Sequence, residues 1–447
     1  MDLKTEDLHT SEADFVFGGE AEAPPGYPES AVLSFPLKHK DGKTWAALRV
    51  RSGVTAATSL PHVAQGQPIQ GSLDLDLAEE TSIKSLTVSI VGELWSNANT
   101  RYEFVRDACT LWTEGEPLPA GAEQPHRGKL KGAFSIPFSM ELPPTVDVPD
   151  ERGKMTTWSL PSSLFTSWTI ANIAYTLQAT IKHGTILHPN HNVSTRVIYH
   201  ATARPDPPSP ARQLAYEQGT PIPSPDSDPE GWHLAIPVTF EGKNPAGQQV
   251  QATYSLAMAK PLSYTRGSVI PLHLTVSCTD EQMLQTLSSP EAVNVYLFRT
   301  CKSGYDVIGG DFPAGFGSHL PLAQVPPTRQ RRYVNQQVQK PVWWAAPSVS
   351  EDATKCALEG EIHLSPRLDL SMRLGMFEFT YVLVLDTPKV PGFPLGKLTQ
   401  AQATPVEICA MYAEGPRPVA HMPPTYDEIK HMNDRPVGLV ATWANFG

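Results

Sequence analysis

Hydrophobic residues recur at every second position in many short runs of this chain, and this spacing restricts the possible folds more than any other feature. Successive side chains of a β-strand point to opposite faces, so the alternation is typical of strands with one buried face. The clearest runs are residues 73–77, 86–90, 134–142, 175–181 and 193–199, followed later in the chain by 254–258 and 270–278. The alternation predicts antiparallel sheets with one wet face, packed in pairs as β-sandwiches.

Three details place individual segments within such sheets. Pro137 interrupts one of the runs, which predicts an edge strand or a bulge, because proline has no backbone N–H to donate. Residues 293–298 and 377–385 are apolar on both faces and are expected to be central strands. Helical spacing is scarce, and residues 280–287 are predicted to form one or two helical turns.

The length of the chain and its prolines divide it into segments. A single hydrophobic core stops growing near about 250–300 residues, so a chain of 447 residues is expected to form two domains. The predicted segments are disordered tails at 1–30 and 413–447, β-sandwiches at 31–201 and 232–412, and an extended, polyproline-like linker at 202–231. Residues 309–350 show no regular pattern and are predicted to be a long loop or insertion.

Charge and cysteine content exclude some classes of protein. The net charge of −11 argues against nucleic-acid binding, which needs clustered Lys and Arg to neutralise phosphates. The five cysteines are widely spaced and form no Cys-x-x-Cys motif, which predicts free thiols in a reducing compartment. The first residues do not resemble a signal peptide, and no apolar run approaches the roughly 20 residues that cross a bilayer. We therefore expect a cytoplasmic protein whose membrane contact comes through a partner or a surface.

Two Pro-Pro-x-Tyr motifs are the sharpest local signals, and each lies in a predicted tail. Their defining residues are Pro24, Pro25 and Tyr27 in the first motif and Pro423, Pro424 and Tyr426 in the second. Paired prolines hold a polyproline II helix before binding, so little conformational entropy is lost when the segment docks. WW domains receive such segments in an aromatic-lined groove, and the tyrosine ring suits a second pocket. Both motifs are predicted to bind WW domains.

The second motif has a helical context. Thr425 and Glu428 fit a capping box, and Ile429 and Met432 would share one face of a short helix over residues 427–433. Such a helix would fold back over the WW surface, so this copy is predicted to be the stronger ligand. The alternative is a frayed tail with an incidental motif.

A basic cluster and a histidine cluster are further candidate sites. Arg329, Arg331 and Arg332 could hold a phosphorylated or acidic cargo tail or anionic lipid, although a solvated loop is the simpler interpretation. Three histidines, His183, His188 and His191, could ligate a metal, but they straddle a predicted turn and lack a nearby Cys or carboxylate. We interpret them as surface histidines and expect no metal site.

Enzyme signatures are missing from the sequence. It contains neither a Gly-x-Ser-x-Gly elbow nor a Gly-x-Gly-x-x-Gly turn after a strand. Gly42-Lys43-Thr44 is similar to the end of a phosphate-binding loop, but Leu37 occupies the position of the first glycine. We therefore expect a protein that is not an enzyme and needs no cofactor.

Several segments, taken in order, resemble the arrestin family. Residues 66–77 and 83–94 resemble the early strands of arrestin N-domains, where a glycine turn leads into an alternating strand. Residues 134–144 and 175–181 resemble later strands of the same domain, and residues 264–274 resemble a strand of the arrestin C-domain. The resemblance covers roughly residues 40–412. It implies an all-β fold of two tandem immunoglobulin-like, arrestin-type sandwiches, and with the two tyrosine motifs it points to the α-arrestins.

The resemblance also implies a function. The α-arrestins are adaptors that bridge membrane transporters or receptors to WW-domain HECT ubiquitin ligases. Here the cytoplasmic tails of such membrane proteins would be the cargo, and the adaptor would be recruited to the plasma membrane or endosomes for ubiquitylation and endocytosis. The alternatives are a pH-response arrestin, a WW-binding signalling scaffold unrelated to ubiquitin, and a retromer-like coat-type subunit. The last would not need the tyrosine motifs.

Overall fold

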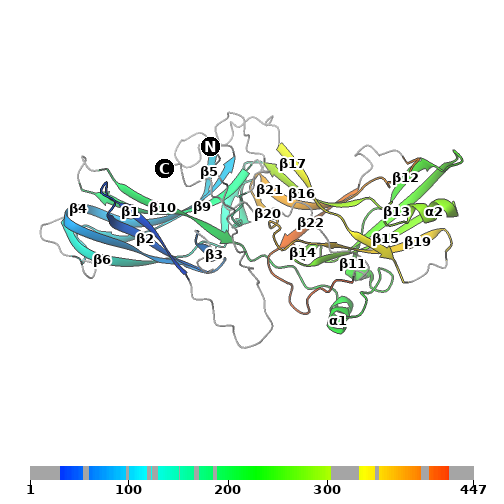
Figure 1. The fold of residues 1–447 in the computed structure, drawn as a ribbon, viewed down its shortest axis with the longest axis horizontal. Coiled ribbons are helices and arrows are strands. Elements are labelled where there is room, and N and C mark those ends of the chain that lie inside the picture. The colour runs from blue at the N-terminus through cyan, green and yellow to red at the C-terminus, as the bar shows by residue number, and fades with distance from the viewer. Residues whose placement is uncertain are drawn as a thin grey trace, which may run out of the picture.

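The described part of the chain is built almost entirely from β-strands, which confirms the predicted all-β class. The computed structural model describes residues 31–53, 60–96, 100–117, 122, 129–150, 152–165, 171–184, 189–303, 332–347, 352–393 and 402–421. Strands β1–β10 form one half of the molecule and strands β11–β22 the other. The two halves lie end to end along the long axis (Figure 1).

The first half is a sandwich whose two sheets share one very long strand. Its strands are β1 (Ala31–Lys38), β2 (Thr44–Ser52), β3 (His62–Ala64), β4 (Ile69–Ser96), β5 (Thr100–Thr113), β6 (Lys129–Met140), β7 (Thr145–Pro149), β8 (Met155–Ser159), β9 (Ala171–His183) and β10 (His191–His200). The beginning of β4 pairs with β2 and β6, and its end pairs with β5 and β9. The register shifts between Leu77 and Thr81, where β4 passes from one sheet to the other.

The position of Pro137 agrees with its prediction. Among the described strands, β6 pairs with β4 alone and is therefore an edge strand. Pro137 lies opposite Ser72 in this pairing. An edge position tolerates the missing N–H because the outer side of the strand has no ladder to complete.

The second half contains two six-stranded sheets. Its strands are β11 (Trp232–Leu234), β12 (Val238–Lys243), β13 (Gln249–Ala259), β14 (Ser263–Thr265), β15 (Val269–Cys278), β16 (Val295–Ser303), β17 (Arg332–Gln339), β18 (Val342–Ala345), β19 (Lys355–His363), β20 (Met372–Leu374), β21 (Phe377–Leu385) and β22 (Gln402–Cys409). The first sheet has the order β11-β13-β15-β19-β18, and β12 also pairs with β13. The second has the order β14-β22-β21-β16-β17, and β20 also pairs with β21.

Predictions for two segments of this half have opposite outcomes. The segments that are apolar on both faces lie in β16 and β21, which have neighbours on both sides, so their assignment as central strands is confirmed. The prediction of an irregular loop over residues 309–350 is wrong in part, because β17 and β18 lie within it. Their pairing with β16 and β19 supplies the hydrogen bonds that such a long loop would lack.

The two halves repeat one topological feature. In each, a three-residue strand pairs in parallel with the last strand: β3 with β10, and β14 with β22. A turn follows with a glycine at positive φ, Gly66 at 77° and Gly267 at 80°, and the chain then enters a long central strand. Glycine is favoured there because other residues rarely adopt this conformation.

The prediction of an extended linker is wrong for residues 210–218, which form helix α1 (Pro210–Gln218). The Ser209 side chain caps this helix by accepting a hydrogen bond from the backbone N–H of Arg212. Pro210 occupies the first turn, where no N–H is needed, and Gly219 ends the helix in the left-handed conformation. The helix predicted near residue 280 is confirmed as α2 (Glu281–Leu287), capped by Asp280.

The linker packs on the second half instead of spanning open solvent. Arg212 of α1 is 1% exposed, and its guanidinium donates to the backbone oxygens of Lys260 and Gly231 at 2.7 and 2.6 Å. The same group lies 5.1 Å from the centre of the Trp232 ring. Ile222 packs against the small hydrophobic cluster of Trp232, Ala257 and Ala259. The hydrogen bond to Lys260, which follows β13, therefore attaches the linker to the second half.

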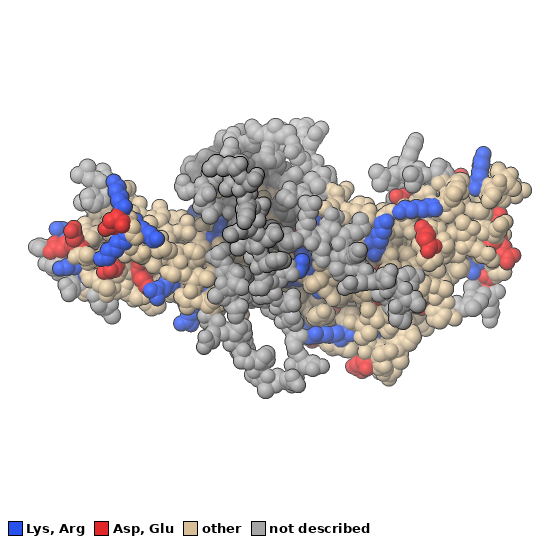
Figure 2. Space-filling model, viewed as in Figure 1, with Lys and Arg blue, Asp and Glu red and all other residues tan. Residues whose placement is uncertain are grey.

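Lys and Arg are interspersed with Asp and Glu on the visible face of both halves (Figure 2). All five cysteines lie in described segments, and none of the five forms a disulfide. In the described part of the chain, no helix has the length and apolar character required to cross a bilayer.

Candidate functional site

The two predicted WW-binding motifs lie outside the described residues, but each lies within four residues of a described segment. β1 begins at Ala31, four residues after Tyr27, and among the described strands it pairs with β2 alone. At the other end, His421 is the last described residue and stands two residues before Pro423. Each motif is therefore connected by a few residues to an anchored point of the fold.

The C-terminal segment (residues 410–421) has no strand, yet hydrogen bonds hold it at both ends. The backbone N–H groups of Ala410 and Met411 both donate to the oxygen of Ala203 at 3.0 Å. The Thr265 hydroxyl donates to the Met411 oxygen at 2.8 Å. At the end of the segment, the N–H of His421 donates to a carboxylate oxygen of Glu361 at 2.6 Å.

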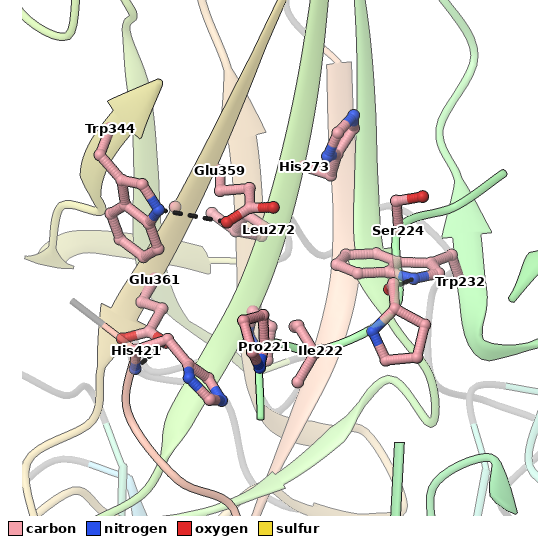
Figure 3. Close-up of a pocket in the computed structure, with 13 residues that line it drawn as sticks. Pro221, Ile222, Ser224, Trp232, Leu272, His273, Trp344, Glu359, Glu361 and His421 are labelled. Atoms are coloured by element: carbon pink, nitrogen blue, oxygen red, sulfur yellow. Dashed lines mark hydrogen bonds between the residues drawn. The ribbon is translucent and has the colours of Figure 1, made fainter. Parts of the chain in front are cut away.

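A pocket lies where the linker, the first sheet of the second half and the C-terminal segment meet. Residues 221–224 of the linker form one wall, and residues of β11, β15, β18 and β19 form the remaining lining, with His421 at one end. Figure 3 shows Trp344 beside Glu359 on one side and Trp232 on the other, with Pro221 and Ile222 between them. Because two carboxylates line it, we call it the acidic pocket.

Glu359 and Glu361 reach the acidic pocket from the same face of β19, since alternate residues of a strand share a face. Glu359 accepts a hydrogen bond from the indole N–H of Trp344 at 3.2 Å. Burial raises the pKa of Glu359, and the neighbouring Glu361 carboxylate adds to the rise, whereas the Trp344 hydrogen bond and His421 lower it.

Glu361 is only 2% exposed. One of its oxygens, Oε1, accepts the hydrogen bond from His421. The other, Oε2, lies 3.2 Å from Nε2 of His363 but accepts no hydrogen bond. A buried carboxylate oxygen without a donor is unfavourable, and in a native fold it needs an explanation.

Only one of the three arginines of the predicted basic cluster lies within the described residues. Arg329 and Arg331 lie outside the described residues. Arg332 is the first residue of β17, and its backbone pairs with Ser303, but its side chain is not described. Its assignment as an anion contact stays a prediction.

The surface assignment of the histidine cluster is wrong for His183, which is 9% exposed. Its Nε2 lies 2.8 Å from Nδ1 of His191, and its Nδ1 lies 3.0 Å from the backbone oxygen of Ser82. His188 lies outside the described residues. Within the described part of the chain, no group of three or more His, Cys, Asp or Glu side chains could hold a metal ion.

A second pair of histidines joins β3 to β10 in the first half. Nδ1 of His62 is 2.9 Å from Nε2 of His200, and the two rings stack with centres 5.1 Å apart. Burial lowers the pKa of His200 to about 4, and the charges of His62 and Arg266 lower it further. Arg266 belongs to the turn after β14, so a residue of the second half affects protonation in the first.

A buried charged cluster in the second half was also missed by the sequence analysis. A guanidinium nitrogen of Arg299 lies 3.5 Å from a carboxylate oxygen of Asp369, and the Tyr381 hydroxyl donates to the Asp369 backbone oxygen at 2.7 Å. Burial raises the pKa of Asp369 to about 6, although Arg299 and Arg266 act against the rise. The sequence feature that could have indicated this cluster is Arg299, a charged residue within the otherwise apolar strand β16.

The sequence also contains a pattern that indicates the acidic face of the pocket. Glu359 and Glu361 alternate with Leu358, Gly360 and Ile362, so the sequence pattern is that of a strand with one acidic face.

No known protein-family model matches the chain, and no curated protein matches it.

Proposed function

We propose that the chain is an arrestin-like adaptor of the α-arrestin type, linking membrane-protein cargo to a WW-domain HECT ubiquitin ligase for ubiquitylation and endocytic trafficking. The observation that carries the proposal is the attachment of both motifs to the fold. Tyr27 precedes the edge strand β1 by four residues, and Pro423 follows the residue held by Glu361 by two. The repeated topology of the two β-sheet halves supports the same family assignment.

This attachment suits ligase recruitment for a physical reason. A WW groove grips a short extended segment that must be accessible from outside the fold. A motif a few residues from an anchored point stays near the body of the protein, and so does the ligase that it binds. Ubiquitin transfer would then be directed at cargo bound to the sandwiches.

Cargo would bind through exposed sheet edges. Among the described strands β1 has a neighbour on one side only, so its other edge offers backbone N–H and C=O groups. An extended cytoplasmic tail can add to such an edge as a further strand. Recruitment to the plasma membrane or endosomes would follow from cargo binding.

The test is a titration of a single WW domain from a HECT ligase with the full chain and its variants. We expect Tyr426→Ala to weaken binding at least tenfold and the double variant Tyr27→Ala/Tyr426→Ala to abolish it. Tyr412→Ala is the matched control, since this tyrosine lies in the C-terminal segment but outside both motifs.

Two outcomes would reject the proposal: no binding by the unchanged chain, or equal binding by the double variant. A WW-binding scaffold unrelated to ubiquitin would give the same titration. It is distinguished by reconstituted ubiquitylation, in which an adaptor increases transfer to a bound cargo tail and a scaffold does not.

A further inference from the structure

Two arginines stack on one tryptophan in the first half of the molecule. The guanidinium carbons of Arg101 and Arg196 lie 4.1 and 4.4 Å from the centre of the Trp95 ring. Arg101 of β5 is directly opposite Trp95 of β4, whereas Arg196 lies on β10, which β9 separates from β4. Trp95 follows the buried Leu94, so its side chain points to the outer face of the sheet. Stacking on the ring therefore positions both charges at this face.

The indole has a fixed orientation, and it leaves both arginines without a carboxylate. The Trp95 N–H donates to an oxygen of Glu93 at 3.1 Å. Glu103 of β5 is bound to another arginine, Arg106, at 2.6 Å. Among the described residues, no carboxylate lies within ion-pair distance of Arg101 or Arg196. The cluster therefore holds two positive charges that no direct partner neutralises.

The electrostatics of Arg196 favour an additional anion beside the ring. Burial lowers the pKa of Arg196, the Glu93 carboxylate raises it, and the charge of Arg101 lowers it. Two like charges held against one ring repel each other, and an anion between them removes this repulsion. Nη1 of Arg196 is enclosed by the protein, so a ligand would be met by the other nitrogens of this group.

The number of donors selects among anions. The two oxygens of a carboxylate match one guanidinium fork, whereas two guanidinium groups offer more donors than a carboxylate accepts in this way. Because both guanidinium carbons lie within 4.4 Å of the same ring centre, one tetrahedral oxyanion at the edge of the ring can reach both. A phosphate monoester has three terminal oxygens and carries nearly two negative charges at neutral pH.

We propose that Arg101 and Arg196, positioned by Trp95, bind the phosphate group of a phosphate monoester. Both guanidinium groups would donate to the phosphate oxygens, while Glu93 holds the indole in place. A soluble phosphate monoester and the headgroup of phosphatidic acid share this chemistry. The site is separate from the two WW-binding motifs, so it stands or fails independently of the proposed function.

The experiment observes the indole N–H resonance of Trp95 in the full ¹⁵N-labelled chain. This N–H is bonded to Glu93 beside both arginines, so its chemical shift reports occupancy of the site. The resonance is assigned with Trp95→Phe, and sn-glycerol 3-phosphate is titrated at neutral pH and constant ionic strength. We expect a saturable shift, about tenfold or weaker binding of acetate, and no saturable shift with glycerol.

Variants of the arginines test the assignment. We expect Arg101→Gln and Arg196→Gln each to weaken binding about tenfold or more, whereas Arg51→Gln, on an exposed residue of β2, removes the same charge and leaves affinity unchanged. Arg101→Lys keeps the charge but lacks the planar fork, so it should restore only part of the affinity. The buried indole of Trp112 reports whether each variant is folded. If Arg196→Gln does not fold, the exposed Arg101 carries the test.

A further arm identifies the source of the phosphate. Co-sedimentation compares vesicles that contain phosphatidic acid with vesicles that contain phosphatidylserine at equal charge. Retention that requires phosphatidic acid and is lost in Arg101→Gln indicates a lipid headgroup, and binding of glycerol 3-phosphate without retention indicates a soluble ligand. The proposal is overturned if glycerol 3-phosphate gives no saturable shift, if acetate binds equally well, or if the folded glutamine variants at the two stacked arginines bind no more weakly than Arg51→Gln.

Discussion

His200 is the last residue of β10, and in the fold its ring stacks on His62. Its pKa falls from 6.5 to about 4, mainly through burial. Between these two values the unfolded chain binds more protons than the folded chain, so stability is lost as the pH falls below 6.5. The loss from this group amounts to about 2 kcal/mol between pH 8 and pH 5. Asp369 acts in the opposite direction, because a raised carboxyl pKa favours the folded state as the pH falls.

We expect the variant His200→Gln to lose less stability in acid than the unchanged chain. The difference in unfolding free energy between pH 8 and pH 5 should shrink by about 2 kcal/mol, because glutamine does not titrate. Urea unfolding at the two pH values measures it. Asn192→Gln, at an exposed and non-titrating position of the same strand, should leave this difference unchanged. An equal acid loss in His200→Gln and the unchanged chain would contradict the assignment.

At the scale of elements, α1 shows how a segment rich in proline becomes a packed helix. Ser209 caps it, Gly219 ends it, and Arg212 bonds it to the second half. We expect Ser209→Ala to destabilise the helix by about 1 kcal/mol, since the N–H of Arg212 loses its acceptor. Hydrogen exchange of residues 210–218 should then be several-fold faster.

Leu214→Ala is the matched control for this prediction. Leu214 lies in the same helix, but it is 51% exposed, so its truncation should leave exchange nearly unchanged. Unchanged exchange in Ser209→Ala would show that the tertiary contacts of Arg212 hold the helix without its cap.

At the scale of the whole molecule, the two halves are joined by several contacts. β8 of the first half contacts β20 of the second, and Ala203, just after β10, accepts hydrogen bonds from Ala410 and Met411. The anchored residues next to the motifs, Ala31 and His421, belong to different halves. The separation of these two points is therefore set by how the halves pack.

We expect this arrangement to support bivalent binding. A tandem pair of WW domains should bind the unchanged chain about 10²-fold or more tightly than it binds Tyr27→Ala, because the second contact is intramolecular. A single WW domain should show no such gain. Equal affinities of the tandem pair for the two chains, measured by calorimetry, would show that both motifs cannot be engaged together.

The sequence alone determined the all-β class, most strand positions and the short helix near residue 280. Alternation records which face of a strand is buried, and that information is local because neighbouring side chains point to opposite faces. The edge position of Pro137 was predictable for a similar reason, since proline lacks an N–H whatever its surroundings. The two tyrosine motifs were likewise visible from the sequence, and their binding role stays a prediction.

Only the tertiary structure decided which outer faces are covered. The linker was predicted to be extended, yet it packs on the second half, where Arg212 donates to the backbone oxygen of Lys260, 48 residues further along the chain. The acidic pocket forms only where residues 221–224, β19 and His421 come together. The burial of His183, His200 and Glu361 depends on such contacts between distant segments. The spacing of residues in a sequence records the periodicity of one segment, but it does not record which other segment will cover it.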